Sequence, residues 1–155
     1  MRPRPVGLIA LATAVDGVLA GASLDRSIKQ LPARHRIGVL AFSAYSQASN
    51  QANGIAWYAA LGVGGALLTL ATTVAALRAG TSENQRQPLV MAAVLSVGHT
   101  LTTARAAPIN FSQRSAGDNE RAPRRIFDHF ERWQAVRAGL QLATFLAMLC
   151  ALAVS

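Results

Sequence analysis

The sequence predicts an all-α integral membrane protein: a single domain over residues 1–155, built as a bundle of four membrane-spanning helices. Hydrophobic residues make up 52% of the chain and charged residues only 14%, whereas an ordinary soluble domain has about 25% charged residues. Stretches nearly free of charge, each close to the ~20 residues that cross the hydrocarbon layer, recur four times. The only cysteine, Cys150, excludes an intramolecular disulfide framework and a cysteine-based zinc site.

The distribution of charge delimits the spans. The first contains a single charged residue, Asp16. Residues 37–77 carry no formal charge, but the part at 43–53 is too polar to lie in lipid. The predicted spans are therefore about 5–24, 54–77, 87–107 and 136–154.

A secretory signal peptide is the alternative interpretation of the first span. Arg2 and Arg4 precede its apolar run, and Ala-Gly-Ala follows it. We favour an uncleaved span, because the hydrophobic region of a signal peptide seldom carries an acidic residue such as Asp16 at its centre.

The basic residues predict the orientation of the chain. Of the 15 Lys and Arg residues, eleven lie in the first and third loops with their flanks. Cytoplasmic loops carry an excess of Lys and Arg, so we expect a bacterial-type inner membrane protein with loops one and three in the cytoplasm and both termini outside. Arg2 and Arg4 oppose this orientation. The net charge of +8 then indicates anionic lipid and not nucleic acid, whose binding proteins are charge-dense.

The first loop is expected to contain an interfacial amphipathic helix. Apolar side chains recur at helical spacing within residues 32–48, and they are Ile37, Leu40, Ala41, Ala44 and Tyr45. The Asn- and Gly-containing stretch at 50–54 predicts a break or kink before the second span.

The third loop is expected to contain a second interfacial amphipathic helix. Asp118 or Asn119 is predicted to cap it. One face of this helix is apolar, and its residues are Ile126, Phe127, Phe130 and Trp133. We expect Phe127 and Phe130 to be interface anchors and Trp133 to lie at the level of the headgroups.

Polar residues inside the spans predict an inward-facing cavity. A charged side chain in a span costs about 2.5–3.5 kcal/mol on insertion scales and usually faces the bundle interior. Asp16 lies near the middle of the first span, beside a small-xxx-small pair, Gly17 and Gly21, that allows close helix packing. The polar and aromatic residues of the other spans lie in the half nearest loops one and three, and they are Trp57, Tyr58, His99, Thr102, Thr103, Arg105, Arg137 and Gln141. We therefore predict a polar cavity that opens toward these loops and is closed at the other end.

Each of these residues also has a structural interpretation. Asp16 could pair with Arg105 or Arg137 to stabilise the bundle, and His99 could be a buried histidine with satisfied hydrogen bonds. Threonines in helices often donate to their own helix carbonyls. Arg137 could extend to the interface instead of facing a ligand.

The sequence does not predict a metal site or a nucleotide site. The three histidines, His35, His99 and His129, lie in different segments, and none has a second ligand three or four residues later. The chain also lacks a phosphate loop, a dinucleotide fingerprint, a nucleophile elbow and a HExxH pair.

Two strings in the last third of the chain resemble the anthrone oxygenase-like family of small four-helix membrane proteins. HTLTTARAAPIN contains Pro108 and Asn110, which match a Pro-x-Asn element after the third span of that family. FDHFERWQAVRAGLQLATFLAMLCAL contains Phe130, Trp133 and Arg137, which match the aromatic-Trp-x-x-x-Arg approach to its fourth span.

The resemblance implies oxidation of an anthrone to an anthraquinone by molecular oxygen, with no cofactor. Such a site needs a base, donors for the resulting anion and a flat apolar pocket. His99 or Asp16 is the expected base, and Arg137 and Arg105 are the expected electrostatic stabilisers. The expected substrate-binding residues are Trp133, Tyr58, Trp57, Asn110, Thr103 and Gln141, together with Arg105.

The alternative is a non-catalytic protein that binds lipid or another hydrophobic molecule, or a small subunit of a membrane complex. It is motivated by the Ala- and Gly-rich spans and the basic amphipathic segments. The expected partners are membrane lipid and a hydrophobic aromatic small molecule. Nucleic acid is not expected, and homo-oligomerisation is left open.

Overall fold

The protein forms four long helical units in a computed structural model that describes residues 5–115 and 120–155. No strand is present within these residues. Each unit is long and apolar enough to cross a membrane, and the units are Val6–Ile37, Val39–Arg78, Glu83–Phe111 and Arg121–Ala153. The predicted all-α architecture with four apolar helices is confirmed. Arg2, Arg4, Asp118 and Asn119 lie outside the described residues.

The first unit is one extended helix that ends at Gly38. It consists of α1 (Val6–Asp25), a π-helical stretch η1 (Arg26–Gln30) and α2 (Leu31–Ile37). Gly38 has φ +87°, a left-handed conformation that glycine adopts without steric cost. The chain therefore turns at Gly38.

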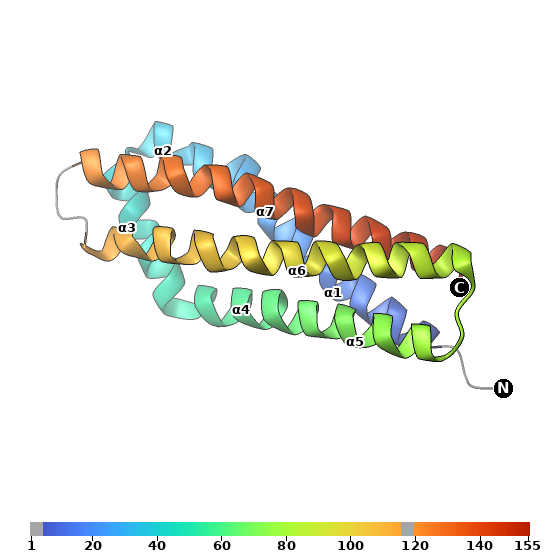
Figure 1. The fold of residues 1–155 in the computed structure, drawn as a ribbon. Coiled ribbons are helices and arrows are strands. Elements are labelled where there is room, and N and C mark those ends of the chain that lie inside the picture. Colours follow the sequence, from blue (N-terminus) through green and yellow to red (C-terminus); the bar gives the residue numbers. More distant parts are fainter. Residues whose placement is uncertain (1–4, 116–119) are drawn as a thin grey trace.

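The second unit bends sharply before it runs along the bundle. It comprises α3 (Val39–Ser49), η2 (Asn50–Gly54), α4 (Ile55–Ala59), η3 (Ala60–Gly64) and α5 (Gly65–Arg78). In Figure 1, α3 lies across one end of the bundle, whereas α4 and α5 follow its long axis. A Cβ on Gly54 would lie 2.7 Å from the Ser49 carbonyl oxygen, so the bend requires glycine there. The predicted kink at 50–54 is confirmed, and the helix begins at Val39, well before the predicted span.

The third and fourth units are the two longest α-helices. They are α6 (Glu83–Phe111), followed by the short 3₁₀ helix η4 (Ser112–Ser115), and α7 (Arg121–Ala153). Figure 1 shows α6 and α7 running antiparallel and side by side, with the start of α1 and the end of α7 at the end opposite α2 and α3. The predicted third-loop segment and fourth span thus form one continuous helix.

Two apolar clusters fill the two ends of the bundle. The cluster at the end where the chain terminates consists of Ile9, Ala12, Ala76, Leu89, Ala92, Met148 and Ala151. The cluster at the opposite end consists of Leu31, Val39, Phe42, Ala106, Phe127 and Phe130. Buried polar residues between the two clusters include Asp16, Thr69, Ser96, His99 and Gln141.

The expectation that Phe127 and Phe130 anchor the chain at a membrane interface is wrong. Both side chains are buried in the cluster beneath α2 and α3. The Phe127 ring meets the Phe42 ring edge to face, with 5.0 Å between centroids. Arg34 of α2, which is only 5% exposed, donates to Asp128 and Glu131 of α7 at 3.1 Å and 2.7 Å. These contacts cover the apolar face of α7.

The apolar helix face that the sequence predicted in the first loop is different, because no described segment packs over it. Its members are all exposed, and they are Ile37, Leu40, Ala41, Ala44 and Tyr45. Buried on the opposite side of α3 are Ser43 and Ser46, which bind Gln113 of η4. Gln113 accepts from Ser43 at 3.1 Å and donates to Ser46 at 3.3 Å. This network holds α3 against the end of α6.

Of the two glycines in the small-residue pair of α1, only Gly17 makes a close helix contact. A Cβ on Gly17 would lie 3.0 Å from Cε2 of Phe145 on α7, whereas a Cβ on Gly21 would meet nothing within 4 Å. Gly17→Leu is expected to lower the free energy of unfolding by about 1–3 kcal/mol through overpacking. Gly21→Leu brings the same gain in helix propensity without a close contact, so it should keep or slightly raise the free energy of unfolding. Unfolding in detergent micelles measures both, and equal losses would contradict the assignment.

Candidate functional site

A cavity of about 240 Å³ lies in the half of the bundle nearest α2 and α3. Its buried wall is formed by Leu19, Asn50, His99, Asn110, Phe130, Arg137 and Gln141. Its exposed rim is formed by Ile55, Ala59 and Val63 of α4–η3 and by Thr100 of α6. The cavity therefore opens sideways between α4–η3 and α6. The sequence predicts that the cavity opens toward the loops. This prediction is corrected, because α2, α3 and the cluster around Phe127 cover that end of the bundle.

All three π-helical stretches contribute residues to the cavity. Arg26 comes from η1, Asn50 and Gly54 from η2, and Gly62 and Val63 from η3. The wider turn of a π stretch shifts the helix register, and such stretches often occur at functional sites.

His99 is the most unusual residue of the cavity. Its side chain is 1% exposed, and neither Nδ1 nor Nε2 has a hydrogen-bond partner in the described part of the chain. Buried polar groups are nearly always paired, so two unpartnered ring nitrogens on a residue that lines a cavity indicate a ligand or proton-transfer position. The alternative of a satisfied buried histidine is not supported.

The backbone carbonyl of His99 accepts hydrogen bonds, whereas its ring forms none within the described residues. The hydroxyls of Thr102 and Thr103 donate to the His99 carbonyl oxygen at 2.8 Å and 2.9 Å. These threonines bond back to their own helix, as the structural interpretation of the spans expects. The Thr103 side chain lines the cavity with its hydroxyl already engaged.

Arg137 is held inside the bundle by a chain of hydrogen bonds. It is 8% exposed, and its Nη2 donates to Oε1 of Gln134. Nε2 of Gln134 donates in turn to the Ser23 carbonyl and to the Ser27 hydroxyl, both at 3.3 Å. These bonds tie α7 to α1 and η1. The interpretation in which Arg137 extends to the membrane interface is therefore wrong.

Two polar atoms beside His99 also lack partners in the described residues: Nε of Arg137 and Oε1 of Gln141. Gln141 lies one helical turn beyond Arg137 on α7, and both line the cavity. Asn110 lines it from α6, and its Oδ1 accepts from Gln113 at 3.2 Å. The cavity thus combines a free base, a cation and amide groups with an apolar rim.

Asp16 lies outside this cavity. Its carboxylate, 2% exposed, accepts a hydrogen bond from the Thr69 hydroxyl of α5 at 2.8 Å. It forms no ion pair in the described residues, so the expected pairing with Arg105 or Arg137 is wrong. Gly65 explains the choice of partner, because a Cβ there would lie 3.2 Å from Val15 Cγ1. Without that Cβ, α1 and α5 approach closely enough for Thr69 to reach Asp16.

Six of the sequence-predicted site residues line the cavity, and they are Tyr58, His99, Thr103, Asn110, Arg137 and Gln141. Besides Asp16, three do not: Arg105 is exposed, Trp57 is 53% exposed, and Trp133 packs against the Phe127 cluster. Nε1 of Trp133 also donates to His129 at 3.3 Å. Arg105 follows His99 by six residues and so lies about 240° around α6 from it. This rotation explains why Arg105 does not reach the cavity that His99 lines.

Arg26 and Phe130 belong to the cavity without having been predicted there. In the sequence, Arg26 is one of several loop-one charges, and Phe130 is one of several apolar residues of an amphipathic segment. The spacing of Arg26 seven residues after Leu19, which also lines the cavity, places both on one helix face. That spacing is the signal that could have identified Arg26.

Comparison with known proteins gives no assignment: no protein-family model, curated protein or solved structure is significantly similar to this chain. The resemblance to the anthrone oxygenase-like family stays a prediction. Of the residues that carry it, Asn110, Phe130 and Arg137 line the cavity. Within residues 5–115 and 120–155, no group of three His, Cys, Asp or Glu side chains is placed to hold a metal ion.

Proposed function

We propose that this chain is a multi-pass membrane protein whose cavity binds a hydrophobic aromatic molecule, such as an anthrone, and oxidises it with molecular oxygen. The observation that carries the proposal is the buried ring of His99, with both nitrogens unpartnered, in the same cavity as Arg137. No cofactor is required by this chemistry. The family resemblance supports the same reaction.

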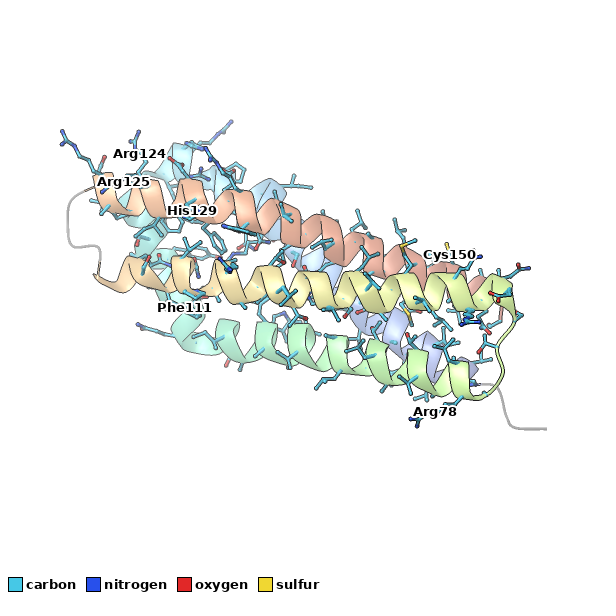
Figure 2. The ribbon with its side chains drawn as sticks, viewed as in Figure 1. Arg78, Phe111, Arg124, Arg125, His129 and Cys150 are labelled. Carbon is cyan, nitrogen blue, oxygen red and sulfur yellow. The ribbon has the colours of Figure 1, made fainter. Side chains whose placement is uncertain are left out.

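Charge distribution supports a membrane orientation with loops one and three in the cytoplasm. In Figure 2, Arg124 and Arg125 point away from the bundle at the end that holds these loops, and Arg78 lies at the opposite end. The excess of basic residues at the first end fits the positive-inside rule. The cavity then lies in the cytoplasmic half of the membrane, and its sideways opening faces lipid, from which an insoluble substrate would arrive.

His99 is the general base in the proposed reaction. An unprotonated ring nitrogen takes a proton from the acidic CH₂ group of the anthrone. The resulting anion is delocalised onto the ring carbonyl oxygen, where Arg137 and the amides of Asn110 and Gln141 stabilise it. These groups are fixed before the reaction, since Arg137 is bonded to Gln134 and Asn110 to Gln113.

The electrons then pass from the anion to oxygen. The anionic carbon forms a C–O bond with O₂ and gives a peroxide, which receives the proton from His99. Loss of the second C–H proton breaks the O–O bond and forms the second carbonyl, and water leaves. One anthrone and one O₂ thus give one anthraquinone and one water.

Oxygen uptake with an anthrone tests the role of His99. In protein reconstituted into nanodiscs, His99→Gln is expected to lower the rate at least about hundredfold, which is the lower range for loss of a general base. His35→Gln changes an exposed histidine outside the cavity and should leave the rate unchanged. Equal rates for His99→Gln and wild type would remove His99 from the mechanism, and no rate above empty nanodiscs would overturn the proposed activity.

Non-catalytic binding of a hydrophobic molecule is the second candidate function. It is favoured by the apolar rim and by the position of Asp16 outside the cavity, which leaves His99 as the only candidate base among the described residues that line it. A ligand that binds in the cavity and is recovered unchanged under oxygen would support it. Oxidation that depends on His99 would exclude it.

A further inference from the structure

We propose that Arg26 and Arg137 together bind a single negatively charged group, so that the cavity selects an anion carried by a compact apolar body. This inference rests on the cavity of the proposed function and adds that the hydrophobic molecule carries an anionic substituent. It adds Arg26, which neither the resemblance nor the sequence pattern assigns to the site.

The two guanidinium groups approach the cavity from different helices and share one aromatic ring. Cζ of Arg26 in η1 lies 5.8 Å from the centroid of the Tyr58 ring, and Cζ of Arg137 in α7 lies 5.9 Å from the same centroid. Arg26 also lies 5.3 Å from the Phe130 ring. Cation–π contacts at these distances orient the guanidinium planes but leave their charge uncompensated.

Within the described residues, neither Arg26 nor Arg137 forms an ion pair with a carboxylate. Arg34 shows the contrast, because two carboxylates of α7 lie within 3.1 Å of its guanidinium. Asp16, the only buried carboxylate among the described residues, is bound to Thr69 instead. Two like charges beside a mostly apolar cavity repel each other, and removing a charge from water is costly unless it is paired. A bound anion would compensate both guanidiniums.

The walls of the cavity define the rest of the ligand. Aromatic rings from three helices, those of Tyr58, Phe111 and Phe130, line the space beside the two guanidiniums. A volume of about 240 Å³ lies just below the ~300–1,000 Å³ of common ligand pockets, so it suits one small fused-ring body. A phenolate, an aryl carboxylate or the phosphate of a lipid whose chains leave through the side opening would supply the anion.

Equilibrium binding of two matched probes tests this inference without any turnover. Naphthoate and naphthalenemethanol share a ring system and differ in charge. With protein in phosphatidylcholine nanodiscs, and with uptake by empty nanodiscs subtracted, we expect wild type to bind naphthoate at least about tenfold more tightly. Arg26→Gln should weaken naphthoate about tenfold and naphthalenemethanol less than twofold. Arg105→Gln removes the same charge from an exposed position and should change neither.

Arg137→Gln provides the second variant, and its helical content and melting temperature are checked beside the binding. Nanodiscs containing phosphatidylglycerol distinguish the two sources of the anion: competition with naphthoate identifies a lipid phosphate, and absence of competition identifies the aromatic anion. Equal weakening of both probes by Arg26→Gln, or equal affinity of wild type for both, would overturn the inference. Oxygen uptake plays no part in these measurements, so a failure of the proposed oxidation remains distinguishable.

Discussion

Gly62→Phe is expected to weaken ligand binding at least about tenfold and to lower oxygen uptake with it. Gly62 lies in η3 and lines the cavity, and a Cβ built on it would meet no other atom within 4 Å. A side chain at this position therefore starts in open space, and we expect a phenyl ring to extend into the cavity. It occupies the space that the ligand would use, beside the opening between η3 and α6.

Gly64→Phe is the matched control for this change. Gly64 belongs to the same π-helical stretch, and a Cβ there also meets nothing within 4 Å, but the residue does not line the cavity. Both variants make the same replacement of glycine in a helix, so their stabilities should change alike. Binding that survives Gly62→Phe, or that is lost equally in Gly64→Phe, would show that the ligand lies elsewhere.

Phe127→Ala is expected to lower the free energy of unfolding by about 3–5 kcal/mol, the range for removal of a buried phenylalanine. The Phe127 side chain is completely buried and packs edge to face on Phe42. Its removal leaves a cavity where α2 and α3 cover α7. Chemical unfolding in detergent micelles, followed by circular dichroism, measures the loss.

Ile28→Ala is the control for Phe127→Ala, because it truncates an apolar side chain that is 73% exposed. Its free energy of unfolding should stay within about 0.5 kcal/mol of wild type. A loss below about 1 kcal/mol for Phe127→Ala would mean that α2 and α3 do not pack on α7 as the structure describes. The interfacial position expected from the sequence would then account for Phe127 better.

The four long helices could be predicted because their signals are local. A run of about 20 residues without charge and backbone hydrogen bonds within a single helix depend on neighbours in the chain alone. The kink at 50–54 is equally local, since Gly54 permits the close approach of the Ser49 carbonyl. Residues such as His99 and Arg137 were placed in the correct half of the bundle because depth along a span follows from residue number.

Which side chains meet in the cavity was decided only by the tertiary structure. Adjacent residues of one helix point about 100° apart, so Tyr58 lines the cavity and Trp57 does not. The packing of η1 beside α7 brings Arg26, and not Arg105, to the cavity that Arg137 lines. Likewise, the sequence predicts an interface position for Phe127, whereas in the structure α2 and α3 pack over it. The composition of a span and the depth of a residue along it follow from the sequence alone. The direction in which a side chain points and the segments that pack over it depend on how each helix packs on the others.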